Sequence, residues 1–126
     1  MMRESQNLKV STHTEGNGLG KIMEISLNVK DRLTLIAILP TTGRMTELVE
    51  VLELIKLLRF TEEEKQEIGY KEADGKILWD ISKEKPRSID INFEQLRIVK
   101  DKIKELDEGG KIDLNTLDTC LKFSKL

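Results

Sequence analysis

The sequence has few of the side chains that build most enzyme sites. Its 126 residues include one cysteine, Cys120, and one histidine, His13. A single cysteine excludes an internal disulfide framework and a multi-cysteine zinc site, and a lone histidine disfavours a histidine-based metal or proton-transfer site. Because the usual nucleophile–base and metal-ligand combinations are missing, we expect a non-enzymatic protein with no catalytic residue, no metal and no cofactor.

An excess of charge of one sign and long apolar runs are also lacking. Lysine and arginine number 21 against 23 aspartates and glutamates, a formal net charge of −2. That balance gives no electrostatic reason to bind nucleic acid or an anionic membrane. No apolar run approaches the ~20 residues of a membrane span, and the first residues, Met1-Met2-Arg3-Glu4, lack the apolar stretch of a signal peptide. We expect a cytoplasmic protein with no membrane partner.

Aromatic residues are scarce, with three Phe, one Tyr and one Trp, so the core must be built mainly from Leu, Ile and Val. Residues 1–20 are dominated by small polar side chains and by Gly16, Gly18 and Gly20. They offer too little apolar surface to offset the entropy cost of ordering. We therefore expect a flexible arm over residues 1–20, with a short strand near Leu8–Val10, and a single domain over residues 21–126.

Hydrophobic periodicity divides the first half of that domain. Alternation from Met23 to Val29 predicts a half-buried strand. A short helix then follows, capped by Asn28 or Asp31 and ended by Pro40. Residues 45–59 give the strongest helix pattern, in which polar residues recur every three positions, so the polar stripe winds around the helix. We expect this helix either to form the centre of the fold or to provide a dimer interface.

Turn and cap signals divide the second half. Thr61 to Glu64 is a capping box that opens a short helix ending at Gly69. An Asp-Gly pair then predicts a hairpin within residues 70–81, anchored to the helices by Trp79. A strand over 88–91 leads into a helix that Asn92 and Gln95 open and Gly109-Gly110 ends, and Asp113 caps a last helix antiparallel to it. The predicted fold is a helix-dominated α+β domain with a small antiparallel sheet, built from 23–29, 70–81 and 88–91, and a C-terminal helical hairpin.

Several segments imitate known sites and fail on detail. Residues 16–21 suggest a phosphate loop, but Glu15 stands where the first glycine is needed and Ile22 where magnesium needs Ser or Thr. Residues 105–116 suggest a calcium loop, but Thr116 replaces the bidentate glutamate. A winged-helix interpretation would use residues 62–68, EEEKQEI, to face phosphates, and their charge disfavours it. The spacing of Cys120 from neighbouring leucines makes it a small packing residue.

The order of motifs resembles that of small uncharacterised proteins encoded by tailed phages and prophages. In these, a strand and a K-[DE]-R-L pattern lead into a helix ending in Leu-Pro, followed by an F-[ST]-E-E-E step, a hairpin ending in Trp-Asp or Trp-Asn, and a K-x-L-D helix end. The matching residues are Lys30-Asp31-Arg32-Leu33, Leu39-Pro40, Phe60 to Glu64, Trp79-Asp80, and Lys104, Leu106 and Asp107. The resemblance covers about residues 23–126 and implies an accessory protein made in the bacterial cytoplasm; it carries over no catalytic residue.

These observations favour a non-enzymatic phage or prophage accessory protein that acts through protein–protein contacts with a host protein, a phage protein or itself. The sequence shows more apolar helix surface than one neighbour needs and no convergent polar residues. The candidate interaction surface comprises Leu54, Leu57, Leu58, Leu117 and Leu121. Three alternatives stay open: a counter-defence protein that binds a host immune component or its nucleotide messenger, a virion or tail-assembly component, and a small nucleic-acid-binding regulator.

Overall fold

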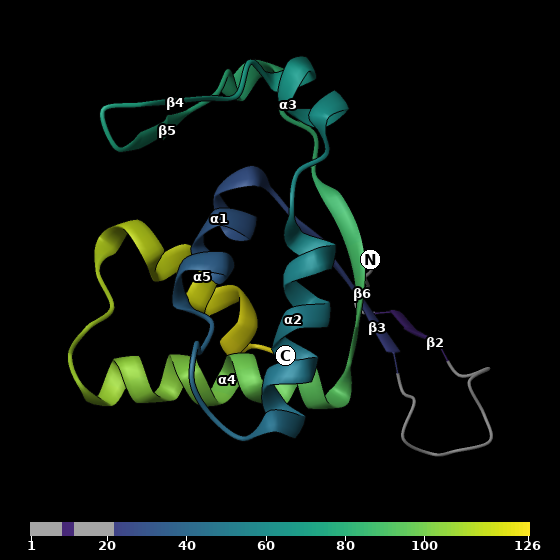
Figure 1. Ribbon diagram of the computed structural model, residues 1–126. Helices are drawn as coiled ribbons and strands as arrows, with labels where there is room; N and C mark the ends of the chain where they lie inside the picture. The colour runs from purple at the N-terminus through teal and green to yellow at the C-terminus, as the bar shows by residue number, and fades with distance from the viewer. Residues whose placement is uncertain (1–8, 12–21) are drawn as a thin grey trace.

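A computed structural model of the chain describes residues 9–11 and 22–126. Within these residues the fold is α+β, with five α-helices and two small antiparallel sheets (Figure 1). The elements in chain order are β2 (Lys9–Ser11), β3 (Ile22–Leu27), α1 (Val29–Ile38), α2 (Met45–Leu58), α3 (Glu62–Ile68), β4 (Lys71–Ala73), β5 (Lys76–Leu78), the 3-10 helix η1 (Ile81–Lys83), β6 (Arg87–Asn92), α4 (Phe93–Glu108) and α5 (Leu114–Ser124). The helix-dominated α+β prediction, with its C-terminal helical hairpin, is confirmed.

The larger sheet has the strand order β2-β3-β6, all antiparallel. In the β3–β6 register Ile25 lies opposite Ile89 and Met23 opposite Ile91. Ile25, Ile89 and Ile91 are buried, so the period-two pattern correctly identified the face that covers the core. Strand β2 lies within the predicted arm; His13 and the glycine-rich segment 16–21 fall outside the described residues.

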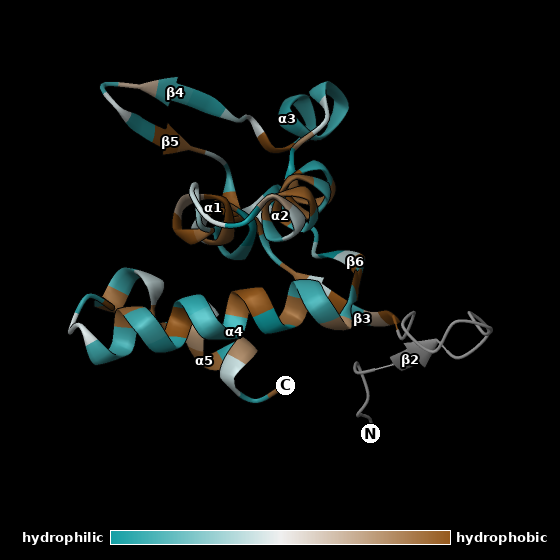
Figure 2. Ribbon diagram, turned by 60° about the horizontal axis from the view of Figure 1, so that its bottom comes forward, coloured by the Kyte–Doolittle hydropathy of each residue, from teal (hydrophilic) through white to brown (hydrophobic). Residues whose placement is uncertain are grey.

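The hairpin does not join this sheet, which corrects the prediction. β4 and β5 form a separate two-stranded sheet that extends from beside α3 and stands clear of α4 and α5 (Figure 2). Its turn is the predicted one, because Asp74 and Gly75 both adopt the positive φ that a tight hairpin turn requires. The hairpin strands are three residues long, and five of their six side chains are exposed. They therefore bury little apolar surface, whereas β6 pairs with β3 over six residues and buries two isoleucines.

Trp79 connects the hairpin to the body through one glutamate. The Trp79 Nε1 donates to Glu84 Oε1 at 2.9 Å, and Glu84 Oε2 accepts the backbone N–H of Val29 at 2.8 Å. The carboxylate of Glu84 thus links the hairpin to the first turn of α1. The backbone N–H of Asp80 also donates to the carbonyl of Ile68 at 2.7 Å, which ties the hairpin exit to the end of α3.

Helix α2 packs on α1, α4 and β6 with one face and leaves the opposite face open. Val51, Leu54 and Leu58 are its buried residues. Its polar positions near the interface are satisfied from α4 and from its N-cap. The side chain of Asn92, the last residue of β6, donates to Glu50 at 3.1 Å, and Arg97 of α4 pairs with Glu47 at 3.1 Å. The winding polar stripe is therefore accommodated by polar contacts with α4.

The core beneath these elements is aliphatic, as expected, with Phe123 of α5 as its large aromatic side chain. The two predicted capping boxes, Thr61–Glu64 at α3 and Asn92–Gln95 at α4, are present. At α1, where either Asn28 or Asp31 was the expected cap, the Asn28 side chain caps the helix and Asp31 returns the bond. Among the residues that the structure describes, no helix combines the length and apolarity needed to cross a bilayer.

Candidate functional site

The structure divides the five leucines of the predicted interaction surface between the interior and the exterior. Leu54 and Leu58 are fully buried in the core, which corrects the prediction that they could contact a partner. They lie on the inward face of α2, and Leu57 is half-buried against the same core. Leu117 and Leu121 lie on α5 at the molecular surface. The C-terminal helices therefore retain the predicted surface, and the C-terminal part of α2 does not.

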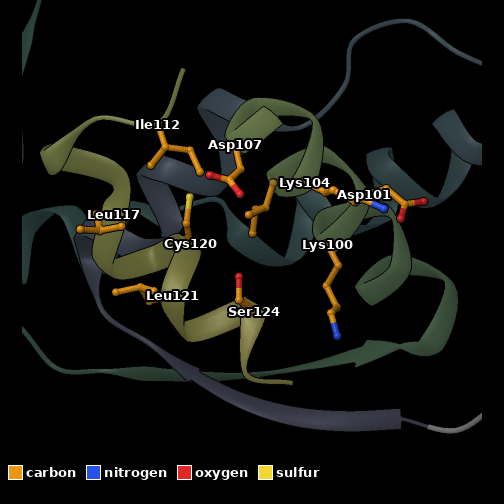
Figure 3. A pocket seen from close by; sticks show the side chains of 10 residues that line it. Lys100, Asp101, Lys104, Asp107, Ile112, Leu117, Cys120, Leu121 and Ser124 are labelled. Atoms are coloured by element: carbon orange, nitrogen blue, oxygen red, sulfur yellow. The ribbon is translucent and has the colours of Figure 1, made fainter. Parts of the chain in front are cut away.

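Leu117 and Leu121 border a groove between α4 and α5 that encloses about 470 Å³ (Figure 3). Its lining residues are Lys100, Asp101, Ile103, Lys104, Asp107, Ile112, Leu117, Cys120, Leu121 and Ser124. The side chains of Cys120 and Ser124 point from α5 toward the side of α4 that carries Asp107 (Figure 3). Ile103 and Cys120 are buried, so the groove is apolar at its base and charged along α4.

Cys120 supplies no nucleophile to this groove. Burial raises the pKa of its thiol, and the carboxylates of Asp113 and Asp107 raise it further, against a smaller lowering by the hydroxyl of Thr116. The thiol therefore stays protonated at neutral pH, and the thiolate is the reactive form of cysteine. Its burial confirms the interpretation of Cys120 as a packing residue. Within the described residues, no three metal-ligating side chains are grouped to hold an ion.

The charges of the groove cancel. Lys100 and Lys104 stand beside Asp101 and Asp107 on α4. The Lys100 Nζ also donates to the carbonyl of Leu126 at 3.2 Å, which places this lysine at the C-terminal end of α5. A phosphate-bearing ligand needs a net positive or donor-rich site. An apolar base with balanced charges suits the apolar side chains of a protein partner better.

A stripe of leucines runs along the outer face of α5 beside this groove. Leu114 is 87% exposed and Leu121 46% exposed, with Leu117 half-buried between them. Their spacing of three and four residues is that of a coiled-coil seam. Sequence reasoning missed Leu114 as a surface residue, although its place in the three–four spacing was a signal that could have identified it. We call Leu114, Leu117 and Leu121 the α5 stripe.

A second exposed apolar set lies on α2. Met45, Val49 and Leu52 follow each other at spacings of four and three residues, and all three are exposed. They occupy the face opposite the buried Leu54. Sequence reasoning did not separate these residues from the buried ones, because apolar side chains surround most of the helix.

The motifs that resemble phage proteins meet in space as a structural network. The Arg32 side chain is almost completely buried, and its Nη1 donates to Glu64 Oε2 at 2.8 Å. Its Nε and Nη2 donate to the backbone carbonyls of Leu58 and Arg59 at 3.0 and 2.7 Å. The guanidinium also lies 3.9 Å from the ring centroid of Phe60. Arg32 thereby joins the end of α2 to the start of α3. Its contacts with Leu58, Arg59, Phe60 and Glu64 hold the fold together.

The neighbouring Asp31 serves the same purpose toward α5. Its carboxylate accepts the Thr119 hydroxyl at 2.7 Å and the backbone N–H of Asn28 at 3.1 Å, and it pairs with Lys122 Nζ. Lys122 also donates to the carbonyl of Ser26 at 3.3 Å. The buried Asp31 is therefore fully engaged in joining α1, β3 and α5. We assign it to the framework rather than to a reactive site.

A smaller hollow between α2 and α4 is lined in part by an ion cluster around Arg97. Arg97 pairs with Glu47, Glu94 and Asp101. The hydrogen bonds that Arg97 donates to Glu94 and Glu47 raise the pKa of the guanidinium further above its usual value. Because three carboxylates surround this arginine, it has little capacity left for an anionic ligand. The α4–α5 groove therefore remains the strongest candidate site.

Comparison of this chain with models of protein families, with curated proteins and with solved structures found no match.

Proposed function

We propose that this chain is a non-enzymatic accessory protein of the phage or prophage type, and that it acts through protein–protein contacts at the α4–α5 groove. The observation that carries the proposal is the α5 stripe, which leaves leucines in water beside a groove with an apolar base. Full burial of a leucine side chain stabilises by about 1.5–3 kcal/mol. A partner that covered Leu114 and Leu121 would therefore gain several kcal/mol from these two side chains.

The phage component of this proposal is supported by motif order alone. Its motif residues Arg32 and Glu64 contribute to the framework, and Lys104 and Asp107 lie along the groove. A protein of this kind needs no reactive group, since it acts by occupying a partner's surface. This is compatible with the engaged state of Asp31, Arg32 and Arg97.

The other functions considered gain less from the geometry. A nucleotide messenger would favour a pocket rich in arginine and lysine, whereas the groove has two lysines offset by two aspartates. A nucleic-acid regulator would need a basic face, and the first turn of α3 consists of three glutamates. A virion or tail-assembly role would also use protein–protein contacts, so it is a special case of the proposed mode of action.

Site-specific photo-crosslinking in the cells from which the chain originates tests this function. A photoreactive phenylalanine analogue replaces Leu121 in the groove, and in a matched variant it replaces Leu78 on the hairpin. The two leucines are similarly exposed, at 46% and 51%, so random collisions label both equally. We expect a discrete protein adduct at position 121 that is absent at position 78. No adduct at 121, or equal adducts at both positions, would contradict the proposal.

A further inference from the structure

We infer that two copies of this chain pair through the outer face of α5, in a two-fold symmetric dimer whose α5 helices run antiparallel. The contact surface consists of Leu114, Asp118, Leu121 and Lys125, which we call the α5 outer seam. The inference goes beyond the proposed function, because the outer seam lies beside the α4–α5 groove and leaves most of the groove lining free. Two features carry it: the exposure of the seam and the order of its charges.

The outer seam lies on the side of α5 that points away from the core. Its four residues follow each other at spacings of four, three and four, and all of them are exposed. Phe123, two residues after Leu121, lies about 200° further round the helix and is buried in the core. This spacing is that of the seam through which two helices pack side by side in a coiled coil.

The two charged residues of the seam are opposite in sign and lie seven residues apart. Among the described residues, neither Asp118 nor Lys125 forms an ion pair. Lys122, which lies between them, turns toward the body instead and pairs with Asp31 of α1. Lys125 keeps helical φ and ψ, so the spacing holds to the end of the seam. Both charges are therefore available to a partner on the outer face.

An antiparallel copy of the same helix presents these charges in the complementary order. A two-fold axis that crosses midway between Asp118 and Lys125 sets Asp118 of each copy opposite Lys125 of the other. A parallel copy in register would place like charges side by side. Because every isologous interface relates a surface to itself, a seam that complements its own reversed copy identifies a second copy of this chain as the occupant.

Both charges also lie on a flank of the helix that this symmetry keeps together. Measured from Leu121, Asp118 lies about 60° and Lys125 about 40° round the helix in the same direction. The two-fold axis is perpendicular to the helices and to the line that joins them, so it leaves this flank of both copies on one side. The two ion pairs therefore form at once. Cys120 and Ser124, which line the groove, lie on the other flank.

The same register covers an exposed leucine. Leu121 lies half a residue, or about 0.8 Å along the helix, from the midpoint between the two charges. The Leu121 side chains of the two copies therefore meet at the axis, beside the two ion pairs, and Leu114 lies at either end of the contact. One pair of 11-residue helices buries a modest area, so we expect a reversible dimer.

Sedimentation velocity of the full chain tests this inference with a charge exchange. Loading concentrations from about 5 to about 500 µM bracket the affinities of small interfaces. The variants Asp118→Lys and Lys125→Asp each place like charges together at two points, and we expect each to weaken dimerisation at least about tenfold. Glu67→Lys, an equal charge change on α3, should leave the affinity unchanged.

An equimolar mixture of the Asp118→Lys and Lys125→Asp proteins is the sharper measurement. Mixing restores opposite charges at every contact, so the mixture should dimerise at least as tightly as the wild type, although neither variant does so alone. Circular dichroism of each variant checks that it folds, since both positions are exposed.

A wild-type chain that stays monomeric over the whole concentration range overturns the inference. A dimer that neither exchange weakens also overturns it, and so does a mixture that stays monomeric. Each of these outcomes leaves the proposed function to its own crosslinking test, because most of the groove lining takes no part in the dimer.

Discussion

Arg32 and its neighbour Asp31 are buried charged residues, and Arg32 has the larger side chain. Its side chain is 2% exposed and its donors meet two backbone carbonyls and Glu64. Replacement by methionine removes these donors and takes from the Leu58 carbonyl its bond from Arg32, whereas the Arg59 carbonyl and Glu64 keep their bonds from Arg87. Because breaking a buried pair in this way is strongly destabilising, we expect Arg32→Met to lower the free energy of unfolding by about 3 kcal/mol, measured by urea denaturation at pH 7.

Arg59→Met is the matched control, since the Arg59 side chain is exposed in the same region and only its backbone carbonyl receives a bond from Arg32. A surface change of this kind should stay within about 0.5 kcal/mol. Equal losses in the two variants would show that Arg32 contributes no more than an ordinary surface arginine.

Glu64 makes part of this stability depend on pH. Hydrogen bonding from Arg32 holds the pKa of Glu64 below its usual 4.5, against a partial offset from burial, and the backbone N–H of Thr61 adds to the lowering. A carboxyl with a depressed pKa in the folded state contributes stability that is present above its unfolded pKa and lost as the pH falls through the folded value. Glu64→Gln keeps the capping geometry but removes the charge.

We therefore expect Glu64→Gln to be less stable than the wild type at pH 7 and the gap to narrow as the pH falls below 4.5. Urea denaturation of both proteins at pH 7 and at about pH 3 measures this. A gap that stays constant between the two pH values would mean that the ion pair with Arg32 contributes nothing to folding.

At the scale of elements, α2 shows how two leucines two residues apart can have opposite roles. Leu54 is 1% exposed and Leu52 is 49% exposed. Leu54→Ala removes packed atoms from the core and should cost about 2–5 kcal/mol. Leu52→Ala should cost no more than about 0.5 kcal/mol. Thermal unfolding followed by circular dichroism distinguishes them, and similar losses would mean that α2 is oriented differently.

Signals carried within a few residues were readable from the sequence. The capping boxes, the Asp74-Gly75 turn and the alternation of β3 each depend on neighbouring side chains, and each lies where it was predicted. The pairing of strands was not readable, because β6 and the hairpin compete for the same edge of β3. The longer apolar match between β6 and β3 decides that competition, and it shows only when both are aligned.

The sequence predicted less of the candidate site than of the fold. Leu117 and Leu121 were predicted from apolar spacing and lie at the groove. The prediction that Leu54 and Leu58 belong to an interaction surface was wrong, because both are buried in the core. A helix with apolar residues on most of its circumference does not reveal which side is covered.

At the scale of the whole molecule, the segment from α3 to η1 is a projection from a helical body. It is attached through the ion pairs of Glu64 with Arg32 and Arg87 and through Glu84. No side chain of the hairpin strands is fully buried, whereas β3 buries two apolar side chains and α4 buries four. Opening the hairpin therefore exposes little apolar surface, and its local stability should be far below that of the body.

Native-state hydrogen exchange followed by mass spectrometry measures this difference. We expect amides of β4 and β5 to exchange through local opening, insensitive to low urea, and amides of α4 and β3 to exchange only on global unfolding. Arg32→Met should then speed exchange in the body, because it lowers global stability, and leave the hairpin rate nearly unchanged. Uniform protection across hairpin and body would mean that the projection folds and unfolds with the core, and that the contacts of Glu64 and Glu84 couple them more strongly than their number indicates.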